Sequence, residues 1–179
     1  KHQITNHLQN KNKFNKSEIF STSWISVIKA TKTFDDELHI EVKEHQPIAS
    51  LGRGRFMTQE GKIITPARGN KSLKLLSIIG RDNEYLGLLD STFLLQDLLN
   101  LKGNFLTSIE HRGSGFIEAV DNENVIYRFN NEDFRVQLER LEELILFELN
   151  SGINDDIRYI DLRYKNAIAL GKKNMEKSI

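Results

Sequence analysis

The sequence predicts an α+β protein of two small domains: an N-terminal αβ unit and a C-terminal mixed or antiparallel sheet packed with helices. Several segments alternate apolar and polar residues, as half-buried strands do, and two others repeat apolar residues at helical spacing. The halves also differ in charge. Residues 1–80 hold 13 basic and 7 acidic residues, whereas residues 81–179 hold 12 and 18. This asymmetry favours two units with different surfaces.

The boundary between the two units is expected in the stretch 66–71, which combines Pro, Gly and polar residues. Such a composition is typical of a linker. We therefore assign residues 1–66 to the first domain and residues 67–179 to the second.

The first domain should contain a helical region followed by strands. Residues 1–21 favour short helices, and the β-branched residues of 24–33 favour a strand. A second strand is predicted over 38–43, where apolar and polar residues alternate. Glu60-Gly61 separates two apolar pairs and predicts a hairpin, because Gly supplies a positive φ.

The second domain begins with a predicted helix over residues 84–100. Its apolar residues near helical spacing are Leu86, Leu89, Phe93 and Leu94. Three strands should follow, at 105–111, 115–120 and 125–129, with a turn over 121–124. The sequence thus predicts a helix and a three-stranded meander.

The strongest helix signal starts at Asn131, a favourable N-cap residue followed by two acidic residues. Its apolar stripe consists of Phe134, Leu138, Leu141, Ile145 and Leu149, and Ser151-Gly152 should end it. A strand is predicted over 157–164, a turn at Lys165-Asn166 and a last strand over 167–170.

Composition excludes several classes of protein. The 25 basic and 25 acidic residues cancel, which argues against a general polyanion binder, and the absence of cysteine excludes disulfides and Cys-ligated zinc. No apolar run approaches the roughly 20 residues of a membrane span. The chain starts at Lys1 without an initiator Met, so we expect a part of a longer protein.

The candidate catalytic and metal-binding patterns are weak. His39, Glu41 and His45 could share a strand face and bridge a metal, but a solvated strand face explains them better. The run 52–54 lacks the third glycine and the helix of a dinucleotide site, so it reads as a turn. Ser114 lies between glycines but precedes a strand rather than the helix of a nucleophile elbow.

Two charged features remain open. Asp161 and Arg163 lie on one strand face and form either an ion pair or partner contacts. A basic patch could bind nucleic acid or anionic lipid, but it lacks interleaved aromatic residues other than Phe56, so we expect no nucleic-acid partner. This patch consists of Arg53, Arg55, Lys62, Arg68, Lys71 and Lys74.

Two separated segments together resemble one family. Run 23–49 matches the periplasmic POTRA motif of the FtsQ/DivIB family of bacterial cell-division proteins, and run 159–164, Tyr-Ile-Asp-Leu-Arg-Tyr, is similar to that family's C-terminal motif. In the first run the matching residues are Trp24, Leu38, Ile40, Val42, Glu44, Pro47, Ile48 and Ala49. In the last strand Ala169-Leu170-Gly171 continues the resemblance.

The resemblance implies a POTRA domain, lacking its first strand here, followed by a β domain. It also implies a non-catalytic divisome scaffold without cofactors, the periplasmic part of a single-pass inner-membrane protein at the septum. FtsB and FtsL would be its principal partners, and FtsK, FtsW and FtsI further ones. The implied partner-binding residues are Arg112, Tyr164, Lys165, Asn166, Ala167, Ile168, Ala169, Leu170 and Gly171.

A last strand at the end of a sheet leaves unpaired backbone groups to which another chain can add as a strand. Simple packing is the alternative for Tyr164, and core positions are expected for Trp24, Ile160 and Leu162. Two other functions stay open: a POTRA-containing module of outer-membrane assembly or secretion, and a small hydrolase. The hydrolase would need His111, Ser114 and a carboxylate in one pocket.

Overall fold

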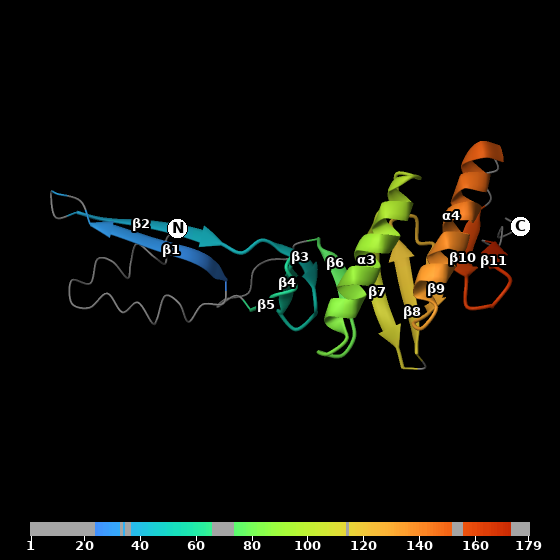
Figure 1. The fold of residues 1–179 in the computed structure, drawn as a ribbon, viewed down its shortest axis with the longest axis horizontal. Coiled ribbons are helices and arrows are strands. Elements are labelled where there is room, and N and C mark those ends of the chain that lie inside the picture. The colour runs from blue at the N-terminus through green and yellow to red at the C-terminus, as the bar shows by residue number, and fades with distance from the viewer. Residues whose placement is uncertain are drawn as a thin grey trace, which may run out of the picture.

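The computed structural model describes residues 24–32, 34, 37–65, 74–113, 115–151 and 156–172. They form a two-stranded sheet and a mixed nine-stranded sheet with two helices, which confirms the α+β class (Figure 1). The helices predicted within 1–21 and the residue Ser114 lie outside the described residues.

The two-stranded sheet is an antiparallel hairpin of β1 (Ile25–Lys32) and β2 (Leu38–Glu44). Both strands agree with the sequence pattern. The hairpin extends away from the nine-stranded sheet and forms one end of the molecule (Figure 1). At its base the ring of Trp24 meets the ring of Phe56 edge to face, with the centroids 6.1 Å apart.

Three short strands follow: β3 (Pro47–Ser50), β4 (Phe56–Thr58) and β5 (Ile63–Ile64). The run 52–54 forms the turn between β3 and β4, as predicted, and all three of its residues have positive φ. Gly61, with φ 78°, lies in the turn between β4 and β5, which confirms the predicted hairpin.

The remaining elements make up the rest of the large sheet. They are β6 (Leu76–Ile79), α3 (Tyr85–Asn100), β7 (Leu106–Arg112), β8 (Phe116–Asp121), β9 (Ile126–Asn130), α4 (Phe134–Ser151), β10 (Ile157–Asp161) and β11 (Ala169–Lys172). The strand order is β11-β10-β9-β8-β7-β6-β3-β4-β5. The last strand thus begins and ends two residues later than the sequence predicts.

Two β–α–β units explain why both helices cover one face of this sheet. In β6-α3-β7 and β9-α4-β10 the two strands are parallel neighbours, and both units advance toward β11. The strands β6, β7, β9 and β10 all run in the same direction, because β8 is antiparallel to both β7 and β9. Because such crossovers are right-handed, two units that share this strand direction and advance to the same side place their helices on the same face. The opposite face, which we call the open face, is covered by neither helix.

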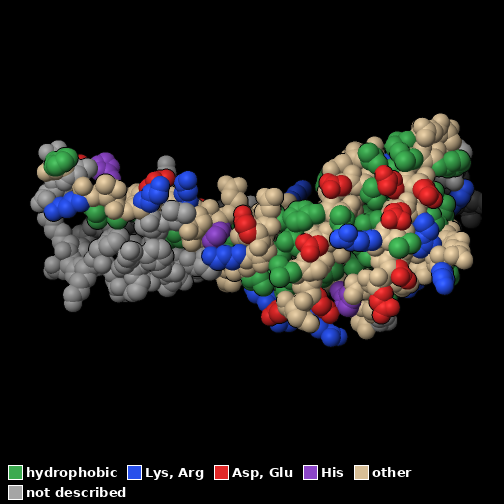
Figure 2. Space-filling model, viewed as in Figure 1, with side chains coloured by type: hydrophobic (Ala, Val, Ile, Leu, Met, Phe, Trp, Pro, Cys, Tyr) green, Lys and Arg blue, Asp and Glu red, His purple; other side chains and the backbone are tan. Residues whose placement is uncertain are grey.

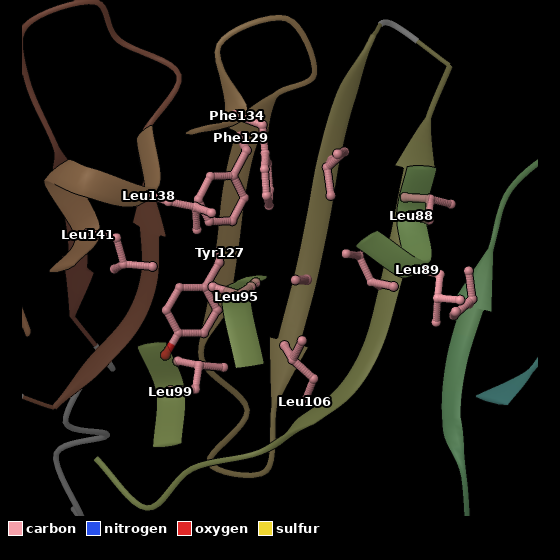
Figure 3. Packing of buried hydrophobic residues seen from close by; sticks show 14 of the residues in the cluster. Leu88, Leu89, Leu95, Leu99, Leu106, Tyr127, Phe129, Phe134, Leu138 and Leu141 are labelled. Atoms are coloured by element: carbon pink, nitrogen blue, oxygen red, sulfur yellow. The ribbon is translucent and has the colours of Figure 1, made fainter. Parts of the chain in front are cut away.

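The core lies between the two helices and the sheet (Figure 3). Phe129 of β9 packs against Phe134 of α4 with ring centroids 4.8 Å apart. Ile160 and Leu162 are buried, as expected.

The predicted apolar faces of both helices need correction. Of the four residues named for α3 only Leu89 is buried, while Leu86, Phe93 and Leu94 are exposed. The helix carries apolar residues on several sides, so spacing alone does not choose the packed side. In α4 the predicted stripe is correct except for Leu149, which is exposed.

Asp121 organises the turn between β8 and β9. Its carboxylate accepts hydrogen bonds from the Tyr127 hydroxyl at 2.9 Å and from the Asn104 amide at 3.0 Å. It also accepts bonds from the backbone N–H groups of Glu123 and Val125. The buried carboxylate thereby holds the turn that the sequence predicts at 121–124.

The large sheet continues across the boundary that we place between residues 66 and 67. β3 pairs in parallel with β6, with Ala49 opposite Leu76. The segment 66–73, which contains the boundary, lies outside the described residues. The division into two domains stays a prediction.

Candidate partner-binding edge

Strand β11 forms one end of the nine-stranded sheet. It pairs with β10 through Asp161–Ala169, Ile160–Leu170 and Tyr159–Gly171. On its other side no strand of the described residues is paired with it. We call β11 the open edge. Its Leu170 side chain is 43% exposed.

The neighbouring strand β10 leaves room only for glycine at position 171. A Cβ atom at this position would overlap the aromatic ring of Tyr159. The Arg128 guanidinium lies over the same ring, 5.2 Å from its centroid, and restrains it as a cation–π partner. The open edge therefore carries no side chain at position 171, where the Tyr159 ring occupies the space.

The segment 162–168, the β10–β11 loop, connects the motif at 159–164 to the open edge. Near its start Arg163 forms a two-point ion pair with Asp161, with distances of 2.9 and 2.7 Å. The hydrogen bonds from Arg163 hold the pKa of the Asp161 carboxyl below its ordinary value, against the opposing effect of burial. Asp161 and Arg163 are thus an ion pair, one of the two readings left open by the sequence.

Tyr164 is exposed, and its side chain is 56% accessible. Lys165, Asn166 and Ala167 are also exposed, while Ile168 and Ala169 are half-buried. The side chain of Tyr164 is therefore not part of the core. Its exposure leaves it accessible to a partner, which stays a prediction.

The open face carries a charge network centred on Glu118. The Glu118 carboxylate accepts hydrogen bonds from Arg112 and Arg128, each at 3.0 Å. Burial alone would raise the pKa of Glu118, but the two arginines lower it below its ordinary value. Arg112 also pairs with Glu110 at 3.1 Å.

Arg112 does not lie on the open edge. It ends β7, and the strands β8, β9 and β10 separate β7 from β11. At a strand spacing of ~4.8 Å this is a separation of about 19 Å. The parallel strands β7, β9 and β10 nevertheless end at the same rim of the sheet, from which the β10–β11 loop starts.

The other POTRA motif residues lie in and after the hairpin. Leu38 is exposed at the start of β2, whereas Ile40 and Val42 are half-buried. Glu44 is exposed and ends β2, and Pro47 begins β3 opposite Thr58. Glu44 and Pro47 therefore mark strand ends.

The structure does not assemble the alternative sites from the residues it describes. No three His, Asp or Glu side chains among them gather to hold a metal ion. His45 lies 2.9 Å from the Lys62 ammonium, and His39 lies near Glu37 instead. Of the basic patch, Arg55 is paired with Asp82 at 2.9 Å, and Arg68 and Lys71 lie outside the described residues.

His111 does have a carboxylate neighbour. Its Nδ1 lies 3.1 Å from Glu84, beside a cavity of about 250 Å³ at the start of α3. Ser114, the nucleophile that a hydrolase would need there, lies outside the described residues. No helix among those described is long and apolar enough to cross a membrane.

Sequence reasoning missed two residues that shape the edge. Tyr159 belongs to the recognised motif, but only the strand register reveals that it covers Gly171. Arg140 of α4 hydrogen-bonds the β10–β11 loop. Its one sequence signal is that an arginine borders the apolar stripe of α4.

Comparison with known proteins finds relatives along most of the chain. No family model matches the chain. It is 24% identical over 156 residues to the cell division protein FtsQ of Coxiella burnetii, covering 87% of this chain and 64% of that protein. It is 25% identical over 160 residues to FtsQ of Actinobacillus pleuropneumoniae, with 87% and 68% covered.

FtsQ of Haemophilus influenzae is 27% identical over 158 residues, with 86% of this chain and 61% of that protein covered. The chain thus spans about two thirds of the length of the curated relatives it matches. Together with the two motifs, these matches support the similarity of the chain to the FtsQ/DivIB family of bacterial cell-division proteins.

Proposed function

We propose that this chain is the periplasmic part of a non-catalytic divisome scaffold that binds FtsB and FtsL by strand addition. The name of its relatives supports a role in cell division. The whole protein would cross the inner membrane once, sit at the septum and connect early division proteins to later ones, including FtsK, FtsW and FtsI. The open edge is the observation that carries this proposal.

A strand of a partner can add to the open edge because no strand among the described residues pairs with its outer side. Main-chain hydrogen bonds would give affinity, and alternate side chains would give selection. Ala169 and Gly171 are small, so a second backbone can approach closely. Tyr164, exposed just before the edge, supplies an aromatic anchor of the kind enriched at binding hot spots.

Arg112 would contact the partner farther along the rim. Its side chain is 46% exposed and is held between Glu110 and Glu118. A partner that continues past the added strand toward β7 would meet this guanidinium. An acidic residue of the partner would then compete with Glu110 and Glu118 for it.

Proline substitution tests strand addition directly. In an antiparallel pair, consecutive residues point their N–H groups alternately toward and away from the neighbouring strand. Of Ala169→Pro and Leu170→Pro, one therefore removes a donor from the β10–β11 ladder, and the other removes a donor that faces outward. The variant that lacks the outward-facing donor should fold normally yet bind the FtsB periplasmic segment at least tenfold more weakly in calorimetry.

The opposite end of the sheet provides a matched control. Ile63 lies on β5, the other terminal strand, and is 39% exposed, close to the value for Leu170. Ile63→Pro should leave FtsB binding unchanged. If folded Ala169→Pro and Leu170→Pro proteins both bind FtsB like the wild type, strand addition at β11 is wrong.

A further inference from the structure

Arg140 of α4 makes an unusual set of contacts with the β10–β11 loop. Its Nη2 donates a hydrogen bond to the carbonyl of Leu162 at 2.8 Å. Its Nη1 lies 2.6 Å from the carbonyl oxygen of Tyr164 and 3.2–3.3 Å from those of Lys165 and Ala167. One guanidinium thus reaches four backbone carbonyls of a single loop.

This guanidinium is committed to the loop alone. The ion pairs of the described residues do not include Arg140. Its Nε is buried and has no hydrogen-bond partner there. Among the described residues, its hydrogen bonds all go to backbone carbonyls of this loop.

A second side chain completes the restraint. Asn130, the last residue of β9, donates from Nδ2 to the carbonyl of Arg163 at 3.0 Å. The carbonyls of four consecutive residues, 162–165, therefore accept bonds from side chains of α4 and β9. Residues 164–167 are exposed, so these bonds rather than burial determine the conformation of this part of the loop.

We propose that Arg140 is a positioning residue for partner binding: it fixes the β10–β11 loop so that Tyr164 and the open edge are preorganised. This inference rests on the proposed function. A loop that is ordered before binding does not lose conformational freedom in the complex, and affinity increases accordingly. Arg140 itself faces the carbonyl side of the loop and acts through it.

The first measurement uses the free protein. Backbone ¹⁵N order parameters should be near 0.85 for residues 164–168 in the wild type, as for rigid backbone, and should fall below about 0.6 in Arg140→Met. Arg140→Lys should not restore order, because a point-like ammonium cannot reach four carbonyls as the planar fork does. Arg140→Gln, which keeps an amide donor, provides a second variant should Arg140→Met fail to fold.

Arg135→Met is the matched control, since Arg135 is an exposed arginine on the same helix. It should change neither the order parameters nor binding. Unchanged loop order in a folded Arg140→Met or Arg140→Gln protein would overturn the inference.

The second measurement titrates each variant with the FtsB periplasmic segment. We expect Arg140→Met and Arg140→Gln to bind at least tenfold more weakly than the wild type, with Arg135→Met unaffected. Greater loop motion with wild-type affinity would also overturn the inference. Absence of FtsB binding by the wild type would contradict the proposed function instead, and the order parameters would still report whether Arg140 orders the loop.

Discussion

The contact between Gly171 and Tyr159 yields a quantitative prediction about the open edge. An added methyl group in Gly171→Ala would overlap the Tyr159 ring. The ring is not free to swing away, because Arg128 lies over it at 5.2 Å. Overpacking of this kind costs about 1–3 kcal/mol. For a chain of this size that corresponds to a fall in Tm of roughly 2–12 °C.

A double-mutant cycle separates this overlap from other effects of the substitution. In a Tyr159→Ala background the methyl group at position 171 has no ring to meet, so Gly171→Ala should cost almost nothing. The expected coupling between the two sites is then about 1–3 kcal/mol, within the range for residues in contact. Urea unfolding of the four proteins measures it.

Gly87 provides a control of opposite sign. It lies inside α3, and a Cβ atom there would have no atom within 4 Å. Gly87→Ala should therefore stabilise the protein by about 0.5–1 kcal/mol through helix propensity.

In the double-mutant cycle, additive effects of Gly171→Ala and Tyr159→Ala, to within about 0.5 kcal/mol, would refute the proposed packing of the edge.

Two further predictions concern titratable groups. Because the pKa of Asp161 is lowered in the fold, its ion pair with Arg163 stabilises the protein above the ordinary pKa near 4 and is lost as the pH falls through the lowered value. Asp161→Asn should cost about 1–2 kcal/mol at pH 7, since Arg163 stays partly hydrated, and the difference in urea unfolding should shrink below about pH 4. Burial, followed by the charge of Asp121, raises the pKa of Tyr127. The contribution of Tyr127 to stability is therefore fully present below its ordinary pKa near 10 and is lost only as the pH rises through the raised value. Tyr127→Phe should cost about 1.5–3 kcal/mol of stability at pH 7. In an alkaline titration followed by absorbance at 295 nm, the folded wild type should form one phenolate fewer than its number of tyrosines, and the last should form only when the protein unfolds.

The strands were the most predictable part of the fold because alternation in the sequence reflects a sheet with two unlike faces. Over 116–121, for example, Ile117 and Ala119 turn to the core while Glu118 turns to the open face. Turn chemistry was equally informative, since Gly61 has the positive φ that only a few residues adopt readily.

The packed side of α3 could not be predicted in the same way. The helix has apolar residues on several sides, and the shape of the sheet decides that Leu88 and Leu95 are buried rather than Phe93 and Leu94. Figure 2 shows that apolar side chains remain on the surface, intermingled with acidic ones, over the nine-stranded sheet and its helices. A one-dimensional pattern contains no information about this choice.

The candidate partner-binding edge was predictable only for the residues that belong to the recognised motif. The resemblance identified the strand that became β11, and the topology places that strand at the end of the sheet. The contacts of Arg140 depend on how α4 crosses the sheet, which joins residues more than 20 positions apart. Such contacts follow from tertiary packing and leave little signal in the local sequence.

The length of the open edge determines which residue should dominate its affinity. β11 has four residues. About two of them face outward, so an added strand gains roughly four hydrogen bonds, worth about 2–6 kcal/mol in total. Association itself costs about 4–15 kcal/mol, so these bonds alone do not hold a partner.

An anchor outside the ladder is therefore required, and Tyr164 is the exposed aromatic residue of the adjoining loop. Tyr164→Ala should weaken FtsB binding about 30-fold or more, as expected for a hot spot of 2 kcal/mol or more. Stability should change by less than about 0.5 kcal/mol because the side chain is exposed, and Arg140 still bonds the backbone carbonyl. Tyr164→Phe separates the ring from the hydroxyl and should keep most of the affinity. Binding of Tyr164→Ala within threefold of the wild type would mean that the partner is held elsewhere, on the open face or near Arg112.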